Sequence, residues 1–155
     1  AQYLLAFIRN ADLVKVACLA QLVNVIAPIL TRPDGLLRQT LHHALTLVAP
    51  HGHGRALEAS LESPTVAAGK RGDVPALDVA AVADGATVRV FAVNRSPDPV
   101  SLSVPGYRVA RAFGMSGDPK AENSWERPNA VVASERDASP TLPGYSLSRL
   151  ELSAS

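Results

Sequence analysis

The sequence predicts a mainly β fold, an antiparallel β-sandwich preceded by a helix–strand–helix segment of the α/β type. In the first fifty residues, apolar side chains recur at helical spacing on either side of a continuous apolar run, VKVACLAQLV. After Gly54 the apolar period changes to two, and prolines and glycines separate several short apolar segments, as in β-sandwiches. We therefore divide the chain into residues 1–53 and 54–155.

The first part is expected to begin with a helix and to continue into a buried strand. Several apolar side chains of residues 1–12 share one helical face. Residues 14–23 are apolar almost throughout, which is typical of a strand covered on both faces in a parallel sheet. Because such a strand needs a neighbour on each side to satisfy its backbone groups, we expect a further chain segment upstream of Ala1.

A second helix is expected in residues 36–48, LLRQTLHHALTLV. Pro28 and Pro33 interrupt the chain before this segment, and Pro50 follows it. Its apolar stripe comprises Leu37, Leu41, Ala44, Leu45 and Val48.

The second part is expected to contain strands alone. Leucine and alanine alternate with glutamate and serine in residues 57–62, and residues 77–96 predict a hairpin with Asp84–Gly85 at its turn. Further strands are expected at residues 100–104, 107–113 and 145–152, with a polar loop over residues 116–142 that contains one short strand near Val131.

Composition excludes several classes of protein. The 155 residues, 16.3 kDa, fit one domain or part of one. Fifteen Lys and Arg against 14 Asp and Glu leave a net charge of +1 without a basic patch, so we expect no nucleic acid partner. The sequence contains no run of 18 apolar residues, so we expect no membrane span. The single cysteine, Cys18, excludes an internal disulfide and is expected to pack in the core.

The four histidines are the one arrangement that suggests a metal site. His42 and His43 precede His51 and His53, and a His-x-His pair on a strand can chelate zinc. Adjacent residues on a helix point about 100° apart, and the second pair lies in a segment rich in proline and glycine. We therefore expect solvated or hydrogen-bonded histidines and no metal or other cofactor.

Several segments together resemble glycoside hydrolase family 51, the α-L-arabinofuranosidases. Residues 15–31, KVACLAQLVNVIAPILT, followed by Arg38-Gln39-Thr40, are similar to the last strand and final helix of that family's (β/α)8 barrel. The family's C-terminal jelly-roll domain is similar to the segments SLESPTV, GDVPALDVAAVAD, VFAVNRS, ENSWERPNAVV and LPGYSLSRLEL. The resemblance thus covers nearly the whole chain and identifies residues 54–155 as a jelly-roll-like sandwich.

This resemblance implies a retaining hydrolase that removes terminal arabinofuranosyl groups from arabinan, arabinoxylan or arabino-oligosaccharides. Retention requires two carboxylates about 5 to 5.5 Å apart, and in the family both glutamates lie on earlier barrel strands. We therefore expect no catalytic residue in this chain. Glu58 and Glu62, on one side of a strand, would lie about 13 Å apart, too far for such a pair.

Gln21 is the residue expected to contact the sugar. It lies near the C-terminal end of the expected last barrel strand, where barrel active sites are assembled. A side-chain amide donates and accepts hydrogen bonds, as a sugar hydroxyl does. The resemblance assigns the matching glutamine to the arabinose pocket. Asn24 is a second candidate for sugar contact, with a loop-shaping hydrogen bond as the alternative.

A noncatalytic function is the alternative hypothesis. Trp125, with Tyr107 and Tyr145, suggests a sugar-stacking platform, although an isolated tryptophan in a sandwich more often packs in the core. The chain would then be a carbohydrate-binding or subunit-assembly module. Under the enzyme hypothesis its partners are the arabinofuranosyl saccharide, the remainder of the barrel and further copies of the same chain. We expect no membrane partner. We expect a cytoplasmic protein, with secretion as the open alternative.

Overall fold

A six-stranded antiparallel sheet forms the centre of the computed structural model, which describes residues 1–155 except for the side chain of Arg71. Its strand order is β10-β9-β12-β7-β6-β3. The strands are β3 (Arg55–Leu57), β6 (Leu77–Asp84), β7 (Thr87–Asn94), β9 (Tyr107–Ser116), β10 (Ser134–Arg136) and β12 (Ser146–Ala154). The expected mainly β class is confirmed.

Both faces of this sheet are apolar, because alternate side chains of each long strand point to opposite sides. Phe91 and Leu147 belong to the cluster on one face, whereas Val90 and Leu150 belong to the cluster on the other. Each cluster is closed by a different set of elements. The sheet is therefore the middle layer of the molecule.

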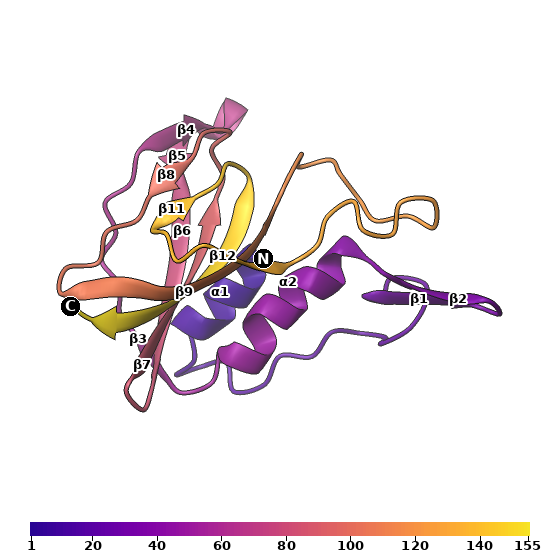
Figure 1. Ribbon diagram of the computed structural model, residues 1–155, viewed down its shortest axis with the longest axis horizontal. Coiled ribbons are helices and arrows are strands. Elements are labelled where there is room, and N and C mark those ends of the chain that lie inside the picture. Colours follow the sequence, from indigo (N-terminus) through magenta and orange to yellow (C-terminus); the bar gives the residue numbers. More distant parts are fainter.

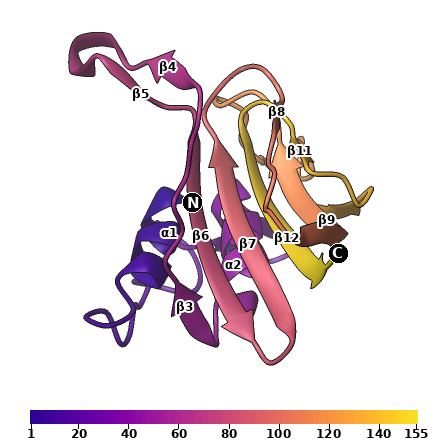
Figure 2. The same ribbon diagram turned by 90° about the vertical axis from the view of Figure 1, so that its left-hand side faces the viewer.

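Two helices cover the first face, as Figures 1 and 2 show. They are α1 (Gln2–Arg9) and α2 (Thr40–Val48), and a 3-10 turn, η1 (Ala49–His51), continues α2. Leu5 of α1 is fully buried against the sheet, and Leu47 and Val48 at the end of α2 are also buried there. Arg9 extends the contact, since its Nη1 donates to Asp78 Oδ1 and to the Val79 carbonyl, both at 2.7 Å.

Shorter elements cover the second face and extend from the sheet. A two-stranded sheet of β8 (Val100–Ser101) and β11 (Thr141–Leu142) packs over the second apolar cluster. The pair β4 (Thr65–Ala67) and β5 (Asp73–Pro75) flanks the 3-10 turn η2 (Gly69–Arg71). The hairpin of β1 (Ile29–Arg32) and β2 (Gly35–Arg38) reaches away from the sheet in Figure 1.

The expected hairpin at residues 77–96 is confirmed, with its turn one residue later than predicted. β6 and β7 pair from Leu77–Asn94 to Asp84–Thr87, so the two turn residues are Gly85 and Ala86. Gly85 has φ 57°, which suits glycine at the first position of a tight hairpin turn.

The expected strand at residues 14–23 is absent from the structure. This segment is irregular, and its only pairing is an isolated parallel bridge from Val23 to Ile29. Within the described residues no strand flanks it, so its backbone groups have no sheet partner. Its apolar side chains are correspondingly exposed: Val16 and Leu22 are 79 and 71% exposed. The adjoining Leu13, Val25 and Ile26 are 64 to 78% exposed.

Other boundaries also differ from the sequence prediction. Residues 35–38 form strand β2 rather than the first turn of a helix, because they pair with β1 across a turn at Pro33 and Asp34. The expected strand in residues 57–62 ends at Leu57. The short strand expected near Val131 lies instead at residues 134–136, at the edge beside β9.

The packing of Phe91 predicts a large stability effect. Its ring is fully buried between the sheet and both helices, so Phe91→Ala should lower the free energy of unfolding by about 3 to 5 kcal/mol. Tyr3→Ala removes an aromatic ring that is 81% exposed, and should change it by less than about 0.5 kcal/mol. Urea denaturation compares the two variants. Equal losses would mean that the first apolar cluster does not stabilise the fold as described.

Candidate functional site

Gln21 and Asn24 lie in the irregular segment between α1 and β1, and both are exposed. Gln21 has φ 60°, Asn24 64° and Val25 57°. These angles fall in the left-handed region, where asparagine is tolerated but a β-branched residue such as valine is a genuine outlier. Strained backbone of this kind concentrates at functional sites, so the segment is a candidate site on conformation as well as on position.

Asn24 joins this segment to the β1–β2 hairpin. Its backbone N–H donates to the Ile29 carbonyl at 2.8 Å, and the Thr31 N–H donates to Asn24 Oδ1 at 2.7 Å. The side-chain amide Nδ2 also lies 3.1 Å from Thr31 Oγ1. The loop-shaping hydrogen bonds expected as the alternative for Asn24 are therefore present. They leave Gln21, three residues earlier, with an exposed amide.

The base of the hairpin is tied to the start of α2. The Gln39 N–H donates to the Pro28 carbonyl at 2.9 Å, and Gln39 Nε2 donates to the Ala27 carbonyl. Ala27 and Pro28 are both buried. The segment that carries Gln21 and Asn24 is thus fixed at the point where it enters the hairpin.

A loop from the sandwich half packs against the hairpin. The Trp125 ring lies 4.2 Å from the Arg32 guanidinium carbon, and a Cβ built on Gly35 would lie 3.3 Å from Trp125 Cζ3. Asn123 is 7% exposed, and its Nδ2 donates to the carbonyls of Arg38 and Val131 at 3.0 and 2.9 Å. The sequence did not predict these contacts; the only signal was the polar, proline-containing composition of the loop.

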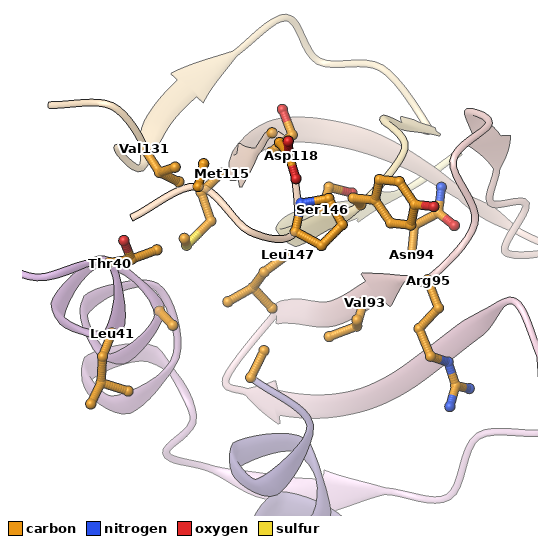
Figure 3. Close-up of a pocket in the computed structure, with 17 residues that line it drawn as sticks. Thr40, Leu41, Val93, Asn94, Arg95, Met115, Asp118, Val131, Ser146 and Leu147 are labelled. Atoms are coloured by element: carbon orange, nitrogen blue, oxygen red, sulfur yellow. The ribbon is translucent and has the colours of Figure 1, made fainter. Parts of the chain in front are cut away.

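A cavity of about 450 Å³ lies between the start of α2 and one end of the sheet (Figure 3). Thr40 and Leu41 of α2 line one side, and Met115, Asp118 and Val131 lie across from them. Asn94, Arg95, Ser146 and Leu147 line the other end. Asp118 is its only carboxylate among the described residues, so the cavity does not supply the pair that a retaining glycosidase requires.

None of the glutamates among the described residues lines this cavity. Glu58 and Glu62 are exposed at the rim of a second cavity, about 620 Å³, which is lined mainly by apolar side chains on the opposite face of the sheet. Glu135 and Glu151 instead approach Arg111, at 3.0 and 3.8 Å. An ion-paired carboxylate is a poor general acid, because the arginine favours its ionised form.

Arg111 belongs to a cationic cluster on the helix side of the sheet. The guanidinium carbons of Arg111 and Arg149 lie 4.7 and 4.0 Å from the centre of the Phe113 ring. Arg149 is only 5% exposed, and burial lowers the pKa of its guanidinium. Its Nη2 lies 3.5 Å from Glu151 Oε1. The cluster connects β12 with β9 and β10, and we interpret it as a contact between strands.

The histidines do not converge on a common point. His42 and His43 stack edge to face with ring centres 5.5 Å apart, and the Ala133 N–H donates to His43 Nδ1 at 3.4 Å. His53 Nδ1 lies 3.4 Å from Asp84 Oδ2. Among the described residues, no three His, Cys, Asp or Glu side chains form a group that could hold a metal ion. Cys18 is exposed, which corrects the expectation that it packs in the core, because the strand that would bury it is not formed.

No helix within the described part of the chain has the length and apolar character needed to cross a membrane.

Comparison with known proteins assigns a family. Residues 1–152 match the family model of the α-L-arabinofuranosidase C-terminal domain. The chain is 38% identical to an intracellular exo-α-(1→5)-L-arabinofuranosidase of Streptomyces lividans, over 96% of this chain and 24% of that protein. It is 37% identical to an exo-α-(1→6)-L-arabinofuranosidase of Bifidobacterium longum, over 83% of this chain and 27% of that protein.

Solved structures of α-L-arabinofuranosidases are similar to this chain as well. A family 51 α-L-arabinofuranosidase of Bifidobacterium longum superposes with a TM-score of 0.80 at 33% identity, over 95% of this chain and 31% of that one. The arabinose complex of the Thermotoga maritima α-L-arabinofuranosidase gives 0.75 at 26% identity, over 96% and 36%. The chain therefore spans about a quarter to a third of the length of these relatives.

The histidines of α2 predict a loss of stability in acid. Burial lowers the pKa values of His42 and His43 below the ordinary 6.5, and the charge of Arg38 lowers them further. The unfolded chain therefore binds more protons than the fold as the pH falls below 6.5, so the stability present above that pH is progressively lost. The urea midpoint should fall between pH 7.5 and 5.5, and His43→Gln should flatten the dependence. An unchanged slope in His43→Gln would assign the effect to other groups.

Proposed function

The chain belongs to the α-L-arabinofuranosidase C-terminal domain family found in glycoside hydrolase family 51, and from this premise we propose that it is the C-terminal part of a retaining α-L-arabinofuranosidase. The family match over residues 1–152 is the observation that carries this proposal. The reaction removes terminal arabinofuranosyl groups from arabinan, arabinoxylan or arabino-oligosaccharides. The catalytic acid and nucleophile are two carboxylates supplied by the remainder of the barrel.

We further propose that residues 1–53 complete that barrel and that residues 54–155 are the sandwich that supports it. The exposed apolar residues between α1 and α2 support this division. A segment whose leucines and valines remain exposed needs an apolar partner, and residues 14–23 have the composition of a strand covered on both faces. The helices on either side of it are already packed on the sheet. The sandwich would therefore hold both ends of the last barrel strand.

Gln21 then lies at the sugar. Its exposed amide at the end of the last strand donates to and accepts from sugar hydroxyls without adding charge beside the catalytic carboxylates. Asn24 shapes the loop through Thr31 and contacts the sugar only with its remaining hydrogen-bonding capacity. We propose a cytoplasmic location because two relatives are named intracellular enzymes. Assembly as a homo-oligomer rests on the family resemblance, and light scattering of the full-length protein tests it.

Activity should require the upstream barrel. The 155-residue polypeptide should not hydrolyse an aryl α-L-arabinofuranoside, whereas the full-length protein that contains it should. The physical reason is that the two carboxylates of the retaining mechanism are expected on the earlier barrel strands, upstream of this chain. The control is the full-length protein purified in the same way. Hydrolysis by the isolated polypeptide would refute the proposal, as would an inactive but folded full-length protein.

Gln21→Ala in the full-length protein should lower kcat/KM for an aryl arabinofuranoside by about 10- to 100-fold, because sugar hydroxyls lose a hydrogen-bonding partner. Gln21→Asn separates the role of the side chain from that of the backbone. Asparagine tolerates the left-handed conformation, but its shorter side chain places the amide farther from the sugar. Glu62→Gln, an exposed site on the sandwich, serves as the control and should stay within about twofold. A kcat/KM of Gln21→Ala within about twofold of wild type would remove Gln21 from the pocket.

A further inference from the structure

The β1–β2 hairpin has little packing of its own. Leu37 is its only buried residue among the eight residues of the two strands. An isolated two-stranded hairpin is marginally stable in water. This hairpin therefore depends on contacts from other elements to keep one position.

Gln39 holds the base of the hairpin, and the loop between β9 and β10, residues 117–133, supplies contacts at its turn. Ser124 and Arg127 exchange backbone hydrogen bonds at 3.2 Å, which closes a tight turn with Trp125 inside it. From this turn the Trp125 ring stacks on the guanidinium of Arg32, the last residue of β1. It also lies beside Gly35, the first residue of β2, where an added Cβ would meet Trp125 Cζ3 at 3.3 Å. One side chain thus lies against both strands beside the hairpin turn.

The loop itself is anchored to the helix that follows the hairpin. The Asn123 N–H donates to Thr40 Oγ1 at 3.1 Å, and Asn123 Nδ2 donates to the Arg38 carbonyl. The Val131 N–H donates to Asn123 Oδ1 at 2.8 Å, which fixes the far side of the loop. Because Asn123 is buried and both ends of its amide are bonded, the part of the loop that precedes Trp125 is held against α2.

Hydrogen bonds connect the hairpin to the candidate site. Thr31 adjoins Arg32 in β1 and bonds Asn24, and Asn24 lies three residues after Gln21. Gln21, Asn24 and Val25 all hold left-handed backbone angles. Such conformations persist only when the surrounding structure enforces them. A displaced hairpin would therefore release the segment that presents the Gln21 amide.

We infer that Trp125 is a positioning residue, through which the sandwich loop fixes the β1–β2 hairpin and thereby orients Gln21 and Asn24 toward the arabinofuranosyl group. The catalytic part of this inference rests on the proposed function. It assigns the sandwich a specific role in substrate binding rather than general support of the barrel. Trp125 acts through Arg32 and Gly35 and need not touch the sugar.

Trp125→Ala in the full-length protein tests this role by two measurements. Hydrogen exchange of the amides in residues 21–38 should accelerate by about tenfold, with no acceleration in β7 and β12. The value of kcat/KM should fall by about tenfold, and equally for an aryl arabinofuranoside and an arabino-oligosaccharide, because the same Gln21 contact is lost for both. Trp125→Phe, which retains an aromatic face for Arg32, should recover most of both effects.

Two further variants separate positioning from general destabilisation. Gly35→Ala adds a methyl group against the Trp125 ring and should reproduce the Trp125→Ala effects in weaker form, although it leaves Trp125 intact. Tyr107→Ala removes a partly exposed ring from β9 and should leave exchange in residues 21–38 unchanged. Unchanged exchange in Trp125→Ala would overturn the inference. A loss confined to oligosaccharides would also overturn it, since it would mean direct stacking on sugar.

The exchange measurement keeps this inference distinct from the proposed function. If the full-length protein hydrolyses no arabinofuranoside, the proposed function fails. The acceleration of exchange in residues 21–38 still reports whether Trp125 holds the hairpin.

Discussion

The apolar character of both faces of one sheet is the constraint on which the rest of the structure depends. Strands β6, β7 and β12 send alternate side chains to two separate clusters, so neither face can be left to water. Helices α1 and α2 cover one face, and β8 and β11 with their connections cover the other. Consequently the helices are not independent of the sandwich. The apolar side chains of both helices pack on the sheet, and this packing fixes where the helices lie.

This constraint explains why residues 10–26 differ so strongly from their surroundings. The chain must cross from the end of α1 to the hairpin before α2, and both helices are already committed to the sheet. Most apolar side chains of residues 13–26 therefore remain exposed instead of packing on the sheet. The same segment carries the left-handed residues Gln21, Asn24 and Val25. Apolar exposure and strained backbone thus coincide in one segment, which supports the proposal that it contacts the remainder of the barrel.

The sequence predicted those elements that have a clear local pattern of apolar and polar residues. The β6–β7 hairpin and strand β12 have strong local patterns, and they were found within a few residues of their bounds. Residues 14–23 show the limit of this reasoning, because an apolar run specifies a buried environment but not the strands that must supply it. Gln21 and Asn24 could be proposed from sequence for their position. The Trp125–Arg32 contact could not, since it joins residues far apart in the chain through a loop without periodicity.

Two buried asparagines hold the loops beside the sheet in fixed positions through hydrogen bonds. Asn94 Nδ2 donates to the carbonyls of Asp98 and Pro143, both at 2.9 Å, so the exit of β7 is fixed beside the entrance to β12. Asn123 fixes the β9–β10 loop to α2 in the same manner. An unsatisfied buried amide costs about 1 to 3 kcal/mol, so each loop has one strongly preferred position. The second loop carries Trp125, which stacks on Arg32 of the hairpin, so the loop connects the sheet to a segment that the sheet itself does not cover.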